Sequence, residues 1–166
     1  GGRIITTDLS QFRSRRDALD WSDFQWLREI WPHKFFIKGV LHAEDARLAV
    51  QYGADGVFVS NHGGRQLDGA QATIDVLPEI RAAVGKDKLV MFDGGIRRGS
   101  DVVKAIALGA DMAFAGRAPL YGVAAGGEAG VKHALDLLKS EVDRVLALIG
   151  CPDVKQIGPQ FLARGA

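Results

Sequence analysis

The 166 residues are 47% hydrophobic and 25% charged, which is typical of one globular domain and argues against a disordered, collagenous or membrane-spanning chain. Because 21 basic residues are balanced by 20 acidic ones, the net charge is only +1, so we expect no binding of nucleic acid, and any anion site must be local. The single cysteine, Cys151, excludes an internal disulfide and a thiolate zinc cluster, indicates a reducing compartment, and leaves us predicting no metal site.

Residues 1–20 are polar and basic with little periodicity, and we interpret them as a mobile segment that leads into the folded part of the chain. From residue 21 onward, short apolar runs alternate with helical patterns, and each run ends at a glycine or a polar residue. This alternation is typical of βα units that build a parallel sheet. Four strands are predicted, at residues 35–40, 56–60, 89–93 and 112–116.

Helical patterns precede the first strand and follow every strand. The predicted helices span residues 21–30, 43–52, 73–84, 100–108 and about 128–149. Glycines stand where the last four of these helices should end in a left-handed conformation, namely Gly53, Gly85, Gly109 and Gly150. Ser100 is predicted to be the N-cap of the helix that it opens.

Four parallel strands fit either a small open sheet or half of a barrel, and the polar residues decide between them. They stand at the carboxyl ends of the predicted strands, where a (β/α)8 barrel builds its active site. We therefore predict an α/β fold in which residues 21–166 form the carboxyl-terminal half of a (β/α)8 TIM barrel, with four parallel strands and flanking helices.

The densest polar cluster, SNHGGRQLD at residues 60–68, follows the second predicted strand. His62 is suited to take up a proton near neutral pH, and Arg65 offers a planar fork for a carboxylate. The two glycines between them allow the backbone to turn so that both side chains point at one ligand. The alternative is an ordinary loop with a surface histidine and an ion pair between Arg65 and Asp68.

Glycine and arginine recur after each of the last two strands, in the segment DGGIRRG at residues 93–99 and in the pair Gly116 and Arg117. Exposed N–H groups beside arginines are what a phosphate dianion requires. Two such loops after consecutive final strands match the phosphate site of barrel enzymes. The alternative is two ordinary glycine turns with solvated arginines.

Lys38 lies inside an apolar strand that should be buried on both faces, where a cation needs a negative partner. We interpret it as a ligand contact. The three histidines outside the polar cluster, His33, His42 and His133, are expected to be capping or surface residues.

Several segments resemble the carboxyl-terminal half of the FMN-dependent α-hydroxy-acid dehydrogenases, the family of glycolate oxidase, lactate oxidase, flavocytochrome b2 and mandelate dehydrogenase. These segments are FFIKGV, VSNHGGRQLDG, FDGGIRRGSDVVKAIALGAD and AFAGR. The resemblance runs from about residue 21 to the end, and SNHGGRQLD is its most specific part. WPHK at residues 31–34 and IGCPD at residues 149–153 are most similar to the mandelate dehydrogenase branch.

The resemblance implies that FMN is the cofactor and that an (S)-2-hydroxy acid of the lactate, glycolate or mandelate type is oxidised to the 2-oxo acid. His62 matches the family's catalytic base, and Arg65 matches the arginine that binds the substrate carboxylate. Lys38 matches a lysine near flavin N1 and O2, where a cation stabilises the anionic reduced ring. The FMN contacts implied in this way are Lys38, Ser60, His62, Asp93, Gly94, Gly95, Arg97, Gly116 and Arg117.

The family domain begins with another half-barrel, which supplies four strands, active-site tyrosines and an aspartate that orients the base. The only tyrosines here, Tyr52 and Tyr121, fall in or beside helical patterns, so we expect an amino-terminal half-barrel as partner. An open half-barrel would leave two strand edges and an apolar inner face uncovered. The alternative function is a non-catalytic half-barrel that binds flavin or phosphate together with a partner chain.

The resemblance also implies a homo-oligomer, which is a tetramer in the family, and a cytoplasmic location. The chain starts about where the family has a long loop after its fourth strand. In the mandelate branch this loop is associated with the membrane, so a peripheral contact with the inner membrane is a further expectation.

Overall fold

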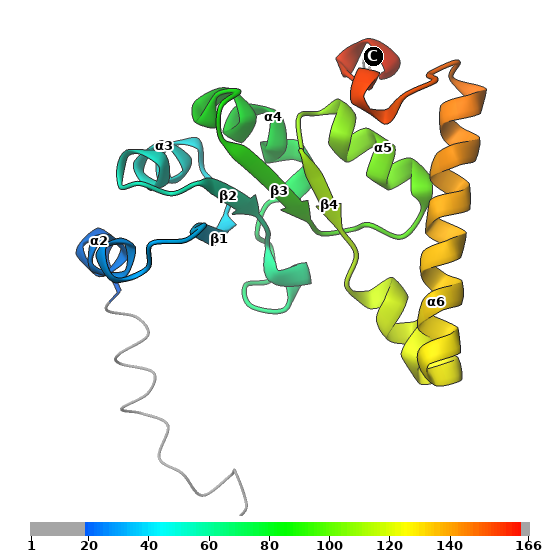
Figure 1. Ribbon diagram of the computed structural model, residues 1–166, viewed down its shortest axis with the longest axis horizontal. Helices are drawn as coiled ribbons and strands as arrows, with labels where there is room; N and C mark the ends of the chain where they lie inside the picture. The colour runs from blue at the N-terminus through cyan, green and yellow to red at the C-terminus, as the bar shows by residue number, and fades with distance from the viewer. Residues whose placement is uncertain (1–18, 164–166) are drawn as a thin grey trace, which may run out of the picture.

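A four-stranded parallel sheet lies at the centre of the computed structural model, which describes residues 19–163 (Figure 1). The strands are neighbours in chain order, as predicted. The predicted mobile segment, residues 1–20, lies almost entirely outside the described residues. The strands are β1 (Phe36–Val40), β2 (Gly56–Val59), β3 (Leu89–Asp93) and β4 (Met112–Phe114).

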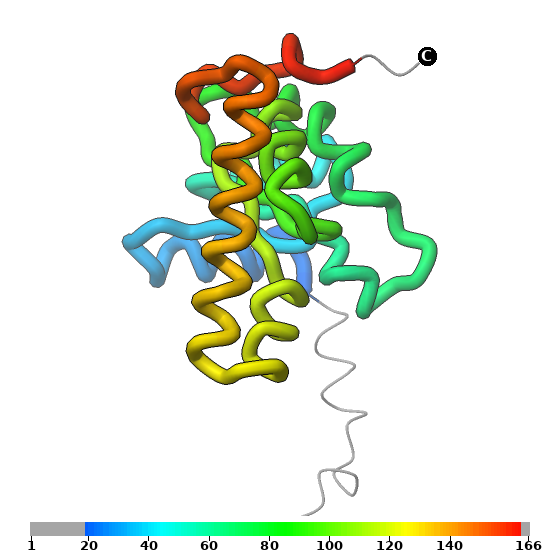
Figure 2. Tube along the Cα trace, turned by 90° about the vertical axis from the view of Figure 1, so that its right-hand side faces the viewer, coloured from blue at the N-terminus to red at the C-terminus, as the bar shows by residue number. Residues whose placement is uncertain are grey.

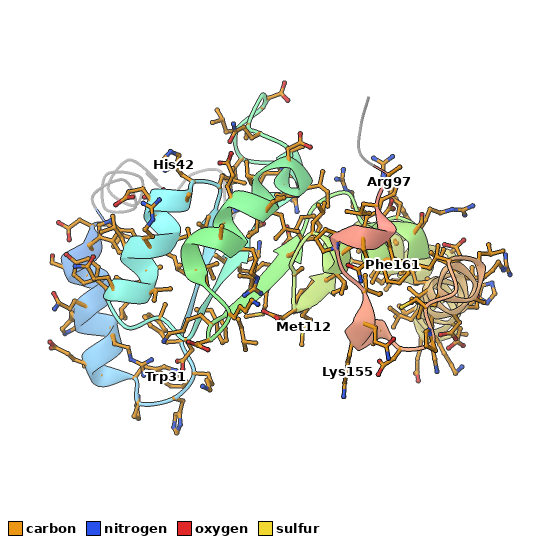
Figure 3. The ribbon with its side chains drawn as sticks, turned by 90° about the horizontal axis from the view of Figure 1, so that it is seen from above. Trp31, His42, Arg97, Met112, Lys155 and Phe161 are labelled. Carbon is orange, nitrogen blue, oxygen red and sulfur yellow. The ribbon has the colours of Figure 1, made fainter. Side chains whose placement is uncertain are left out.

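Helices connect the parallel strands, because the chain must cross back from the carboxyl end of one strand to the end of the sheet where the next strand begins. The last helix packs along the one before it, and Figure 3 shows it nearly end-on at one side of the sheet. Within residues 19–163, no helix is both long and apolar enough to cross a bilayer. The helices are α2 (Trp21–Ile30), α3 (Ala43–Gln51), α4 (Thr73–Val84), α5 (Gly99–Ala107) and α6 (Arg117–Leu148). Three 3-10 turns complete the described part, η2 (His62–Gly64), η3 (Val154–Gln156) and η4 (Pro159–Phe161).

The glycines predicted to end helices do so. Gly53, Gly85, Gly109 and Gly150 all have positive φ, between 68° and 109°. Left-handed backbone is open to glycine at little cost and stops the helix by turning the chain away. These four glycines therefore determine where α3, α4, α5 and α6 end.

The two faces of the sheet differ. Side chains that point toward the helices are buried, with Val57, Val59 and Val90 all at 0% exposure. Side chains that alternate with them face the other side, where Met112 and Phe114 are 54% and 37% exposed. A doubly wound sheet is covered by helices on both faces, whereas sequential βα units inside a barrel cover only the outer one. The coverage therefore agrees with part of a barrel.

Helix α6 begins eleven residues earlier than predicted, at Arg117, directly after β4. The backbone leaves helical geometry at Gly126 and Gly127, and these two glycines join two helical arms by a tight turn (Figure 2). The arms approach so closely at Gly122 and Gly130 that a Cβ on either residue would overlap the backbone of the other. The first arm is rich in glycine and alanine, which conceals its helical pattern in the sequence.

The start of α5 also differs from the prediction, because Ser100 lies inside the first turn and the helix begins at Gly99. Two carboxylates satisfy its first N–H groups instead. Asp101 accepts hydrogen bonds from the N–H groups of residues 97 and 98, both at 2.9 Å. Glu141, on α6, accepts from the N–H of Gly99 at 2.8 Å. A side-chain cap from Ser100 is therefore unnecessary.

The amino ends of the strands carry a separate polar network around Asp55. Its carboxylate accepts hydrogen bonds from the ammonium of Lys34 and the N–H of Phe35, both at 2.9 Å, and pairs with Arg28 at 3.2 Å. The bond from Lys34, followed by that from Phe35, holds the pKa of Asp55 below its ordinary value. This network ties α2 to β1 and β2, at the edge where barrels place stabilising residues.

Candidate active site

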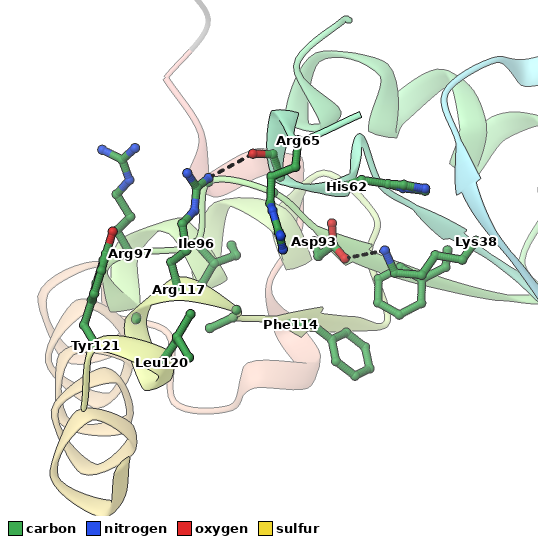
Figure 4. Close-up of a pocket in the computed structure, with 17 residues that line it drawn as sticks. Lys38, His62, Arg65, Asp93, Ile96, Arg97, Phe114, Arg117, Leu120 and Tyr121 are labelled. Carbon is green, nitrogen blue, oxygen red and sulfur yellow. Dashed lines mark hydrogen bonds and ion pairs between the residues drawn. The ribbon is translucent and has the colours of Figure 1, made fainter. Parts of the chain in front are cut away.

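The carboxyl ends of the four strands surround one open cavity of about 1100 Å³. Figure 4 shows Lys38 and His62 on one side of this cavity and Arg97 and Arg117 on the other. Of the predicted site residues, all but Ser60 line it, namely Lys38, His62, Arg65, Asp93, Gly94, Gly95, Arg97, Gly116 and Arg117. The structure thus brings together residues from β1 and from the carboxyl ends of β2, β3 and β4 with the loops that follow them.

Ser60 lies beneath the cavity and organises its floor. It is 1% exposed, and its hydroxyl donates to Asp93 Oδ1 at 2.6 Å while accepting from Lys38 Nζ at 2.7 Å. The N–H of His62 also donates to this hydroxyl, at 3.1 Å. A single buried oxygen therefore connects the ends of β1, β2 and β3.

Lys38 has a negative partner in the protein itself, Asp93, and is not buried, while its predicted contact with a ligand stays a prediction. Its ammonium pairs with Asp93 Oδ2 at 3.0 Å and lies 5.0 Å from the ring centroid of Phe58. The side chain is 47% exposed. The predicted burial on both faces is wrong because β1 is an edge strand and the inner face of the sheet is open. Lys38 is consequently free to reach a ligand in the cavity.

His62 stands in a constrained loop. Its φ of 56° makes it the one residue other than glycine with positive φ in the described part of the chain. Such a conformation costs on the order of 1–3 kcal/mol and persists only where the surroundings impose it. Here the hydroxyl of Ser60 holds its N–H, and the side chain of Asn61 accepts from Gly63 N–H at 3.1 Å. The loop therefore presents the imidazole at the cavity rim.

Arg65 lines the same cavity as His62. No ion pair joins it to Asp68 within residues 19–163, in contrast to the alternative interpretation of this loop. Because Asp68 does not hold it, the guanidinium of Arg65 is available to an anionic ligand.

The same loop is also connected to the start of α6, where Arg117 Nη2 donates to the carbonyl of Gly63 at 3.3 Å.

The loop after β3, for which we predicted anion binding, offers fewer N–H groups than the sequence indicates, because Asp101 and Glu141 occupy those of residues 97–99. In the described part of the chain, no hydrogen bond uses the N–H of Gly95 or Ile96. The N–H groups still free for an anion are therefore those of the glycine turn itself, together with the start of α6 at Gly116.

Sequence reasoning missed the apolar lining. Phe58 and Phe114 pack together with ring centroids 4.7 Å apart, and Ile96, Leu120 and Tyr121 also line the cavity. The alternation within β2 carries a signal for Phe58, because it lies between two residues that face the helices. The sequence motifs drew attention only to polar residues.

Comparison with known proteins identifies the family and the fold. Residues 5–164 match the family described as FMN-dependent dehydrogenase. The chain is 53% identical over 145 residues to (S)-mandelate dehydrogenase of Pseudomonas putida, and the aligned region covers 87% of this chain and 36% of that relative. It is 51% identical over 145 residues to L-lactate oxidase of a Nostoc species, which covers 87% of this chain and 40% of that relative.

A crystal structure described as the monotopic membrane protein (S)-mandelate dehydrogenase aligns with a TM-score of 0.86 and 47% identity, covering 99% of this chain and 45% of that one. The predicted α/β fold is confirmed, since the four parallel strands form part of the TIM barrel of that fold. The chain spans less than half the length of each of these relatives. It belongs to the FMN-dependent dehydrogenase family.

Proposed function

We propose that this chain contributes the base, the carboxylate clamp and most of the phosphate site of an enzyme that oxidises an (S)-2-hydroxy acid to the 2-oxo acid with FMN. The observation that carries the proposal is the shared cavity, into which His62, Arg65, Lys38 and both glycine-arginine turns converge. An acid-base group, a carboxylate fork and an anion cradle around one space are the parts that this reaction needs.

The residues of the cavity fit FMN. A Cβ built on Gly95 or on Gly116 would meet no atom within 4 Å, so both turns leave room for a phosphate. Arg97 and Arg117 add positive charge beside them. Phe58 and Phe114 would offer apolar surface to a planar ring, and Lys38, Asp93 and Gly94 would offer polar contacts. Ser60, which is buried and does not line the cavity, would act through its hydrogen bonds to Lys38 and Asp93. When bound there, FMN supplies the electron acceptor.

The protein's own side chains perform the remaining tasks. Arg65 binds the substrate carboxylate through its planar fork and so fixes the orientation of the hydroxyl-bearing carbon. His62 takes up the substrate proton, for which a neutral imidazole is suited near pH 7. Lys38 holds a positive charge at the side of the cavity where negative charge develops, and Ser60 and Asp93 keep its ammonium in place.

Replacement of His62 tests this proposal. We expect His62→Ala to retain the yellow colour of bound FMN but to lose anaerobic bleaching by lactate or mandelate, with a reduction rate lower by about 10²- to 10⁴-fold. His133→Ala, at an exposed position of α6, is the matched control and should bleach at the unaltered rate. Bleaching of the His62 variant at the rate of the control would reject the proposal.

A non-catalytic half-barrel is the second candidate, because the cavity is open and the chain spans less than half of its relatives' length. A purified chain that is coloured but never bleaches with either acid would support this candidate. The two relatives differ by only two percentage points in identity, so we propose lactate, glycolate or mandelate as the class of substrate.

The open inner face supports a partner as part of the proposal. We propose that an amino-terminal half-barrel of the same protein covers this face, that the complete domain forms a homo-oligomer, and that the protein is cytoplasmic with a peripheral contact to the inner membrane. A crystallised relative is described as a monotopic membrane protein.

A further inference from the structure

Gly39 is an extra residue in β1. Lys38 pairs with Phe58 and Val40 pairs with Val59, so the residue between them has no partner in β2 and forms a β-bulge. Residues two apart in a regular strand point to the same face. The bulge breaks this rule, since Lys38 lines the cavity whereas Val40 is buried in the core.

The missing side chain of Gly39 leaves the space that the imidazole of His62 occupies. A Cβ on Gly39 would lie 3.0 Å from Cε1 and 3.2 Å from Nε2 of His62. These distances are tighter than ordinary van der Waals contact, so a Cβ on Gly39 would push the ring by a few tenths of an ångström. The φ of Gly39 is +97°, which is also unfavourable for residues other than glycine.

The backbone of His62 is fixed independently of this contact. Its N–H donates to the buried hydroxyl of Ser60, and its positive φ of 56° is imposed by the loop. The imidazole therefore starts from a fixed backbone and lies against the Cα of Gly39. The bulge at Gly39 and its lack of a Cβ therefore both affect where the imidazole of His62 lies.

We propose that Gly39 is a positioning residue that seats the imidazole of His62 at the cavity rim, on the same strand end as Lys38. The kinetic consequence rests on the proposed function, in which His62 is the base, but the seating of the ring does not. A base must lie within hydrogen-bond reach of its proton, and since a displacement of about 1 Å can cost on the order of 10²-fold in rate, a shift of a few tenths of an ångström should cost severalfold.

The variant Gly39→Ala tests the proposal, with Gly53→Ala as its matched control. Gly53 has a similar φ, +91°, but a Cβ there would meet only the side chain of Arg28, which lies at the amino ends of the strands, away from the cavity. The imidazole ¹H–¹³Cε1 signals of the FMN-loaded protein are measured by NMR, with His62→Ala used to assign the signal of His62. His33, His42 and His133 serve as internal references.

We expect Gly39→Ala to shift the signal of His62 alone and to lower flavin reduction at saturating substrate by about 3- to 10-fold, while substrate KM changes less than twofold. Gly53→Ala should leave both unchanged. In the unaltered protein, an NOE between a Gly39 Hα and His62 Hε1 is expected, and this measurement does not depend on how either variant folds.

An absent NOE, an unshifted His62 signal in Gly39→Ala, or an equal shift in Gly53→Ala would each overturn the proposal. A shifted signal with an unaltered reduction rate supports the seating by Gly39 and overturns its kinetic consequence, whereas the role of His62 as the base is decided by the bleaching rate of His62→Ala. Failure of this inference and failure of the proposed function are thereby distinguished.

Discussion

Ser60 shows how a small buried group can organise a site that charged residues dominate. Its hydroxyl accepts from Lys38 and from the N–H of His62 and donates to Asp93. A hydroxyl is suited to this place because it combines one donor with two acceptor lone pairs. The side chains that would hold a ligand therefore depend on a residue that does not itself line the cavity.

We expect Ser60→Ala to lower the free energy of unfolding by about 1–3 kcal/mol, since it leaves the N–H of His62 and one oxygen of Asp93 without their partner. Urea unfolding of the two proteins measures the difference. Ser140→Ala is the control, because its exposed hydroxyl bonds only the carbonyl of Leu137 on the same helix, and it should change stability by less than about 0.5 kcal/mol. Equal midpoints for the two variants would contradict the role of Ser60.

At this scale the sequence allowed prediction of which polar residues meet, because the carboxyl ends of parallel strands share one edge. It did not allow prediction of exposure. Lys38 was expected to be buried because its strand is apolar, but exposure depends on what covers the inner face, and that lies outside the strand itself. Phe58 escaped attention because the alternation within β2 separates it from Val57 and Val59 but does not say which of the two faces the helices cover.

At the scale of elements, α6 holds the start of α5 in place. Glu141 accepts from the N–H of Gly99 and pairs with Arg98 at 3.2 Å, and a Cβ on Gly99 would overlap the backbone of α6. The segment that lines the cavity ends at Arg97, two residues before this contact. The loop after β3 is thus anchored at its far end by a helix from elsewhere in the chain.

We expect Glu141→Ala to destabilise the protein by about 0.5–2 kcal/mol, the usual effect of removing a helix cap. Glu141→Gln should retain most of the stability, because its amide oxygen can still accept from Gly99 and the lost pair involves a largely exposed arginine. Asp143→Ala, at an exposed position of the same helix, is the control. Thermal unfolding compares all three, and a Glu141→Ala variant as stable as the control would contradict the anchoring contact.

The order and type of the elements were predictable from alternating apolar runs and from the glycines that end each helix. The two errors, at Ser100 and in the first arm of α6, have a common cause. Local patterns favoured a serine cap and a helix that begins only at about residue 128, whereas contacts distant in sequence decided both, through Glu141 in one case and through the crossing of Gly122 and Gly130 in the other.

At the scale of the whole molecule, the sheet has one face buried by helices and one face open to solvent. The open face carries apolar side chains, and Leu89, Met112 and Phe114 are each more than a third exposed. Contiguous apolar surface of this kind marks a contact site, and both edge strands, β1 and β4, leave backbone groups unpaired on their outer sides. A complementary half-barrel would cover the face and both edges together.

We expect the 166-residue chain alone to bind the dye 1-anilinonaphthalene-8-sulfonate on this face, and an added amino-terminal half-barrel to abolish the fluorescence. Met112→Lys should lower the dye signal of the chain and weaken capture of the added half, because a cation would be enclosed among apolar side chains without a partner. Leu67→Lys, in an exposed loop, is the control and should change neither. Fluorescence titration and sedimentation check both effects. Equal capture by the two variants would contradict burial of the inner face, because an enclosed lysine at position 112 must resist assembly.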